Sequence, residues 1–83
     1  MKYGVWVFTY SEASDTVKFR SIFSDSLVGL EKKQESVAQE LIGDDSRSFW
    51  GSYPTNRGSF QMASADFRNR VMSYKERGFS YAV

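Results

Sequence analysis

The 83-residue chain carries few side chains that could perform covalent or metal chemistry. It contains no cysteine and no histidine, which excludes thiolate nucleophiles, the commonest general base and the preferred zinc ligands. The only adjacent acidic pair is Asp44-Asp45, and two carboxylates without a third converging oxygen are poor ligands for a hard cation. No serine lies in a nucleophile motif, and the glycines form no phosphate-binding loop. We therefore expect a protein that is not an enzyme and uses neither a metal nor a cofactor.

Aromatic and basic side chains are the better candidates for function, and they occur in two groups. Rings beside cations can contact a partner protein, or stack on nucleic-acid bases while the cations neutralise phosphates. The first group consists of Trp6, Phe8, Tyr10, Lys18 and Arg20. The second group consists of Arg47, Trp50, Tyr53 and Arg57. We take these residues as the candidate binding residues.

Residues 2–10 are typical of one strand that carries apolar side chains on both faces, with the first-group rings on one of them. The environment of these rings depends on the turn that follows. A turn of odd length, such as residues 11–15, places Phe8 opposite Lys18 and Trp6 opposite Arg20, which builds an aromatic and basic surface. A turn of even length places the rings beside other apolar side chains in an ordinary core. The sequence leaves both alternatives open.

The second group has two interpretations as well. Tryptophan, tyrosine and arginine are over-represented at protein-binding hot spots, so this segment could form a contact patch. Alternatively, Phe49 and Tyr53 pack under the helices while Trp50 caps an edge of the sheet.

The elements that must position these groups are predicted from periodicity. Residues 16–23 alternate like a strand, although a helix also fits their apolar spacing. The clearest helix follows, up to a natural stop at Gly43, with Ser24 or Ser26 as its N-cap. Because Gly29 weakens the first turns, we expect this helix to begin nearer Glu31.

The second half of the chain predicts a hairpin, a helix and a strand. The hairpin covers residues 47–63 with its turn at residues 54–58. A helix with Ser64 as its cap then covers residues 65–77, and residues 79–83 form a terminal strand. In the competing interpretation the helix already begins at Ser59.

This order of elements predicts one α+β domain over residues 1–83. We expect a two-layer sandwich of ferredoxin-like type, with a four- or five-stranded, mostly antiparallel sheet and two helices on one face. The first strand would lie in the middle of the sheet, and its second face would stay open unless another chain covers it.

Charge and hydropathy restrict the partners. Residues 1–45 hold five basic and eight acidic side chains, a net charge of −3, and residues 46–83 hold six basic and two acidic ones, a net charge of +4. The overall charge of +1 is too small for strong non-specific DNA binding. No apolar run approaches the roughly 20 residues that cross a bilayer, and no signal segment precedes the first strand. We expect a cytoplasmic protein with no membrane partner.

Two short segments resemble the motifs of RNA-recognition modules. Val5-Trp6-Val7-Phe8 has the rhythm of the first-strand motif, and residues 57–62 begin like the third-strand motif with a basic residue and a glycine. Ser59 and Gln61, however, occupy the positions where that family places its stacking rings, and a strand at residues 16–22 has no place in its topology. The resemblance implies single-stranded nucleic acid as the alternative ligand.

The sequence therefore predicts a small, non-enzymatic protein-protein interaction module. We expect an inhibitor or adaptor of a larger protein or complex, of the kind that phages and mobile elements use as accessory or anti-defence proteins. A second copy of the chain is a further expected partner, in a homodimer. The alternative is a module that binds single-stranded nucleic acid through an open aromatic and basic sheet face.

Overall fold

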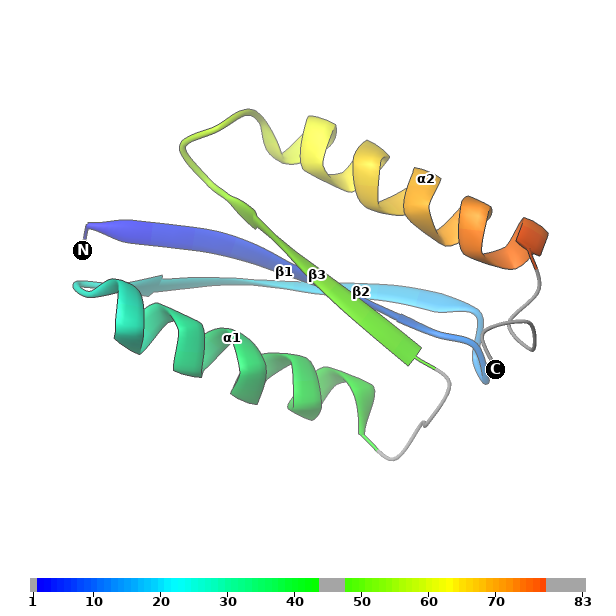
Figure 1. The fold of residues 1–83 in the computed structure, drawn as a ribbon, viewed down its shortest axis with the longest axis horizontal. Coiled ribbons are helices and arrows are strands. Elements are labelled where there is room, and N and C mark those ends of the chain that lie inside the picture. Colours follow the sequence, from blue (N-terminus) through cyan, green and yellow to red (C-terminus); the bar gives the residue numbers. More distant parts are fainter. Residues whose placement is uncertain (1, 44–47, 78–83) are drawn as a thin grey trace.

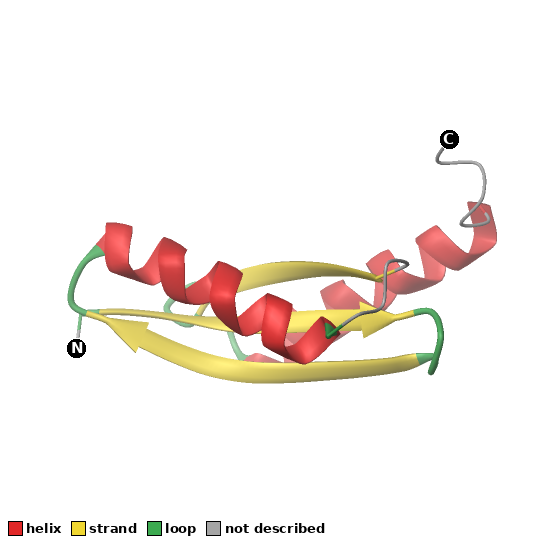
Figure 2. Cartoon of the chain, turned by 90° about the horizontal axis from the view of Figure 1, so that it is seen from below, coloured by secondary structure: helices red, strands yellow, loops and turns green. Residues whose placement is uncertain are grey.

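The computed structural model describes residues 2–43 and 48–77, which form one antiparallel sheet and two helices. The elements are β1 (Tyr3–Ser11), β2 (Thr16–Ser24), α1 (Leu27–Ile42), β3 (Ser48–Pro54) and α2 (Phe60–Arg77). The strand order is β2-β1-β3, so β1 lies in the centre. Figure 1 shows the strands between the two helices, and the second view in Figure 2 shows one helix in front of the sheet and the other behind it.

A four-residue turn sets the register of the first hairpin. Ser11 pairs with Thr16, so residues 12–15 form the turn, and pairing continues without interruption to the other end of both strands. Phe8 therefore lies opposite Phe19, and not opposite a cation. The turn has the even length of the second alternative, and the strand predicted at residues 16–23 is confirmed as β2, one residue longer. The aromatic and basic surface that an odd turn would have built is not formed.

The face of the sheet toward α1 holds an aliphatic core. The buried members come from β1, β2 and α1, and Val37 and Trp50 pack against them at partial exposure. These buried residues are Val5, Val7, Ile22, Leu30 and Ala38. Since β1 contributes its odd-numbered side chains here, its even-numbered ones must point to the opposite face.

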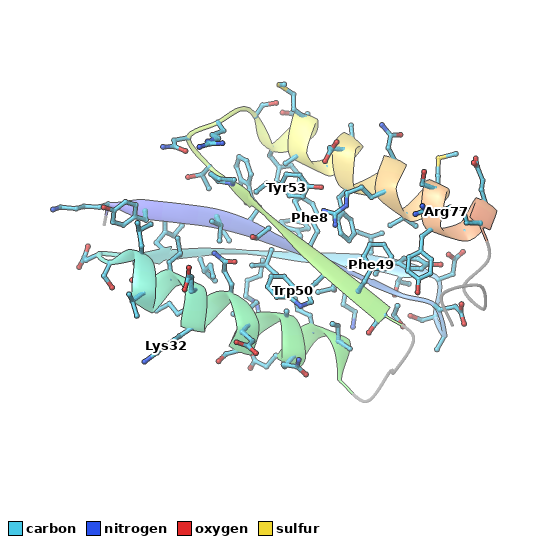
Figure 3. All side chains as sticks on the ribbon, viewed as in Figure 1. Phe8, Lys32, Phe49, Trp50, Tyr53 and Arg77 are labelled. Carbon is cyan, nitrogen blue, oxygen red and sulfur yellow. The ribbon has the colours of Figure 1, made fainter. Side chains whose placement is uncertain are left out.

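The face toward α2 holds an aromatic core, which includes two of the predicted binding residues. Its buried members are Phe8, Tyr10, Ala63, Phe67 and Val71. The Phe8 and Phe67 rings stack at 5.4 Å between centroids. Figure 3 shows Phe8 and Phe49 between the strands and α2, with Trp50 on the side of the sheet toward α1.

The expectation that both helices cover one face was wrong. The strand β1 is apolar on both faces, and with a single helix layer one of these faces would have remained in water. Each face instead receives one helix. The structure is thus a small α+β fold with a three-stranded antiparallel sheet, and the expected ferredoxin-like sandwich of four or five strands is not confirmed. The strand predicted at residues 79–83 lies outside the described residues.

Side-chain caps fix where the helices begin. The Ser26 hydroxyl accepts from the Gly29 amide at 3.0 Å, so α1 begins at Leu27 despite Gly29, and the expected start near Glu31 was wrong. Gly43 ends this helix as predicted, at a φ of 66°. The Ser59 hydroxyl accepts from the Met62 amide at 3.1 Å.

The Ser59 cap confirms the competing interpretation of the second half of the chain. Residues 60–62 belong to α2, so the second strand of the predicted hairpin does not exist. The Ser64 hydroxyl does not cap a helix but contacts Arg68 inside α2. None of the helices formed by the described residues combines the length and apolar character needed to cross a membrane.

Replacing Phe8 with alanine tests whether this ring belongs to the core. Phe8 is 1% exposed, so the Phe8→Ala variant is expected to lose about 3–5 kcal/mol of unfolding free energy. That is a large part of the roughly 5–15 kcal/mol typical of a domain. The control is Phe19→Ala on the neighbouring strand, 54% exposed, which should lose only about 0.5–1.5 kcal/mol through its ring contacts. Urea unfolding measures both, and equal losses would contradict the assignment.

The first turn is tied to the far end of α2 by a carboxylate. Asp15 Oδ1 accepts from the Tyr10 hydroxyl at 2.7 Å and from Lys75 Nζ at 3.1 Å. These two contacts lower the pKa of Asp15, with the Tyr10 hydrogen bond as the larger cause. Burial, reinforced by Asp15, raises the pKa of Tyr10 to about 12. The phenol therefore remains a hydrogen-bond donor at neutral pH.

Asp15 should make the free energy of unfolding depend on pH in the acidic range. Because its folded pKa is lowered, its contribution is complete above its unfolded value of about 3.9 and is lost as the pH falls through the folded pKa. The Asp15→Asn variant is expected to be less stable than the wild type at neutral pH, with a smaller loss on acidification. Denaturant unfolding across this range measures the difference. Glu35→Gln, at an exposed position of α1, should keep the wild-type dependence; an unchanged acid loss in Asp15→Asn would contradict the role.

Candidate functional site

The first predicted group is divided between the two faces of the sheet. Phe8 and Tyr10 are 1% and 2% exposed under α2, so their rings are not accessible to a ligand. Lys18 and Arg20 are exposed on the other face, beside α1, where Arg20 Nη1 lies 2.8 Å from Glu40 Oε2. Trp6 alone among these rings remains partly exposed.

The second group is also divided between the two faces, because successive side chains of β3 point to opposite faces of the sheet. Trp50 packs against the aliphatic core under α1, while Tyr53 packs against the aromatic core under α2. Phe49 and Tyr53 thus pack under a helix, as the alternative interpretation expected. Contrary to the same interpretation, Trp50 does not cap the edge of the sheet but lies under the other helix. Arg47 lies outside the described residues. Arg57 is exposed in the turn between β3 and α2.

Three of the predicted residues meet at a hollow beside the start of α2. Its volume is about 390 Å³, and it lies between β1, the end of β3 and the first turns of α2. Its main lining residues are Trp6, Tyr53, Pro54, Arg57, Met62 and Asp66. We call it the tryptophan hollow. Trp6, Tyr53 and Arg57 come from separate segments, and the sequence placed them in two different groups.

A fixed polar cluster lies on one wall of the tryptophan hollow. The Tyr53 hydroxyl donates to Asp66 Oδ2 at 2.7 Å and accepts from Arg70 Nη1 at 3.3 Å. Burial raises the pKa of Tyr53; Asp66 adds to this rise, and the hydrogen bond from Arg70 opposes it. The phenol is therefore neutral at physiological pH, and both of its hydrogen-bonding directions are in use. Such a group orients a ligand better than it performs acid-base chemistry.

Two exposed phenylalanines extend from this region along the outer strand β2. Phe19 is 54% exposed and Phe23 is 45% exposed, both on the face of the sheet toward α2. We call them the phenylalanine edge. The Phe19 ring rests on Phe60 at 4.7 Å between centroids. The Phe23 ring lies directly over Gly4, where an added Cβ would come within 2.6 Å of it.

The phenylalanine edge and the tryptophan hollow are joined through Phe60, and we call the two together the continuous apolar surface. Phe60 connects them, since its ring contacts Phe19 on one side and Trp6, at 5.5 Å between centroids, on the other. Met62, 66% exposed, covers the outer wall of the hollow. Sequence reasoning missed Phe19, Phe23 and Met62 as surface residues. For Phe19 and Phe23, alternation in a predicted strand was the available signal, but alternation does not say which face is covered; Met62 lies in α2 and had no such signal.

The side chains that the tryptophan hollow and the phenylalanine edge present are mainly apolar and aromatic. Among the described residues, no group of three acidic side chains is placed to hold a metal ion. The polar side chains that line the hollow are the Tyr53 phenol, the Asp66 carboxylate, the Arg57 guanidinium and the Ser59 hydroxyl. No protein-family model, curated protein or solved structure matches the chain. The contact surface itself is therefore the basis for a functional proposal.

Proposed function

We propose that the chain is a non-enzymatic protein-protein interaction module that binds its partner through the continuous apolar surface. The observation that carries the proposal is the exposure of Phe19, Phe23 and Met62 around the partly buried Trp6. Large side chains of this kind are costly to leave in water, and a contiguous group of them commonly marks an interaction site.

The composition of the surface favours a protein over a nucleic acid. Tryptophan, tyrosine, methionine and arginine are enriched where proteins meet. Arg57 and Asp66 place one charge of each sign at the tryptophan hollow, as in the polar rim of a protein interface. Lys18 and Arg20, which a bound nucleic acid would need near the rings, extend from the opposite face of the sheet. The open aromatic and basic face of the nucleic-acid alternative is absent from the described residues.

A small domain of this kind acts by occupying a partner's surface. We therefore propose, more specifically, an inhibitor or adaptor of a larger protein. In size and composition the chain is analogous to the accessory proteins of phages and mobile elements. The tryptophan hollow would accept an apolar side chain of the partner as an anchor, while Arg57 and Asp66 would orient polar groups around it.

Two methionines on α2 provide a matched test. Met62 lies at the hollow and Met72 lies elsewhere on the helix, at 66% and 58% exposure. Affinity capture from the source cells identifies the bound protein, which is then purified and titrated. Met62→Glu is expected to weaken binding at least about tenfold, because it places a charge where an apolar anchor is desolvated. Met72→Glu should remain within about twofold of the wild type, as expected away from an interface.

Both variants should fold, since glutamate is a good helix former and the substituted side chains are exposed. Circular dichroism and urea unfolding check this. Equal effects of the two substitutions, or the absence of any stoichiometric protein partner, would contradict the proposal. Salt-dependent binding of short RNA or DNA in place of a protein would favour the alternative ligand.

A further inference from the structure

We propose that the phenylalanine edge is covered by a second copy of the chain, with the two β2 strands paired antiparallel about a two-fold axis at Ser21. This inference rests on the proposed function as an interaction module and names the occupant of one part of its surface. The resulting sheet would have six strands, in the order β3-β1-β2-β2-β1-β3.

The outer side of β2 is suited to strand addition. The described residues place β1 on one side of β2 and no strand on the other. The strand has nine residues, contains no proline, and pairs with β1 in an unbroken register without a bulge. Proline, bulges, very short length and charged side chains, lysine above all, are the usual features that protect an edge from pairing, and of these β2 carries the two charges Lys18 and Arg20. Arg20, a charge on this strand, is already engaged by Glu40 at 2.8 Å.

Symmetry and charge limit the register of such a pair. A two-fold axis normal to the sheet places the same face of both copies on the same side of the joined sheet. Because side chains alternate between faces, one residue on the axis must then pair with its own copy, and the axis cannot fall between two residues. An axis at Phe19 would place Lys18 opposite Arg20, and an axis at Arg20 would place two copies of Arg20 face to face. Like charges directly opposite destabilise a sheet. An axis at Ile22 would place Phe19 opposite Asp25.

The register about Ser21 removes these conflicts. It places Lys18 opposite Ser24 and Arg20 opposite Ile22, so no like charges lie directly opposite each other. It also places Phe19 of each copy opposite Phe23 of the other, because the two rings lie at equal distances on either side of Ser21. Cross-strand aromatic pairs are favourable. The dimer would thus contain two Phe19–Phe23 pairs, one on each side of the axis. In the single chain Phe19 is 54% exposed and Phe23 is 45% exposed.

Two features of the single chain bear on pairing. Lys33 Nζ donates to the Phe23 carbonyl at 2.8 Å, a contact that the flexible ammonium group can exchange if this carbonyl joins a strand pair. The tryptophan hollow lies toward β3 and α2, away from the outer side of β2. The dimer would therefore display two copies of the hollow, each free for a partner protein.

A symmetric cross-link tests both the pairing and its register. The chain has no cysteine, so Ser21→Cys introduces a single thiol at an exposed position. Directly opposite residues have Cα atoms about 4.5–5.5 Å apart, within the reach of a disulfide. Mild oxidation of Ser21→Cys is expected to give mainly disulfide-linked dimer.

Lys18→Cys on the same strand is the matched control. In the proposed register its two copies lie about 20 Å apart, so it should stay largely uncross-linked under the same conditions. Equal cross-linking of the two variants, or preferential cross-linking of Lys18→Cys, would overturn the proposal.

Sedimentation provides an independent measurement on the chain without cysteine. The wild type is expected to form dimers as its concentration rises, and Ser21→Asp should raise the dissociation constant at least about tenfold, because it opposes two carboxylates on the axis. A wild type that stays monomeric, or a Ser21→Asp variant that dimerises equally well, would overturn this inference. Neither result would change the comparison of Met62→Glu with Met72→Glu, on which the proposed function depends.

Discussion

The fold depends on the need to bury both faces of β1. Val7 and Phe8 are neighbours that point in opposite directions, and both are almost completely buried. A strand in this situation must lie in the centre of a sheet and must have a layer on each side. Two helices supply these layers, one to a face, as Figure 2 shows. The aliphatic core under α1 and the aromatic core under α2 follow directly from the alternation of side chains along this one strand.

One helix is too narrow to cover three strands, and this explains where the apolar surface lies. On the aromatic face, α2 packs over β1 and β3, where Phe49 stacks on Tyr74 at 4.7 Å and contacts Phe67. On the outer strand β2, Val17 packs against this core and Phe19 contacts Phe60 at the start of the helix. The β2 rings at Phe19 and Phe23 nevertheless remain exposed. The expectation that one face of the central strand stays open was wrong, because α1 and α2 cover both faces of β1, and the exposed rings lie on the outer strand instead.

Polar and apolar side chains are arranged differently around this surface. Polar groups near the apolar surface hydrogen-bond to one another, as Tyr53 does with Asp66 and Arg70. Tyr53 and Asp66 of this group line the tryptophan hollow beside the apolar side chains of Trp6, Pro54 and Met62. The phenylalanine edge presents both rings and a side of β2 that no other described strand pairs with, which suits a partner that itself contributes a strand. The two parts of the surface are thus suited to different occupants, and both could be filled at once.

The sequence by itself determined the elements that local signals specify. The strand at β1, the helix α1 with its serine cap and glycine stop, and the lack of histidine and cysteine chemistry can all be read from residue types and spacing. The start of α2 was ambiguous, because the serines at 59 and 64 are equally good caps in isolation. Only the tertiary structure decided which face each helix covers and which rings are exposed. The reason is that period-two alternation assigns side chains to two faces but contains no information on what packs against either one.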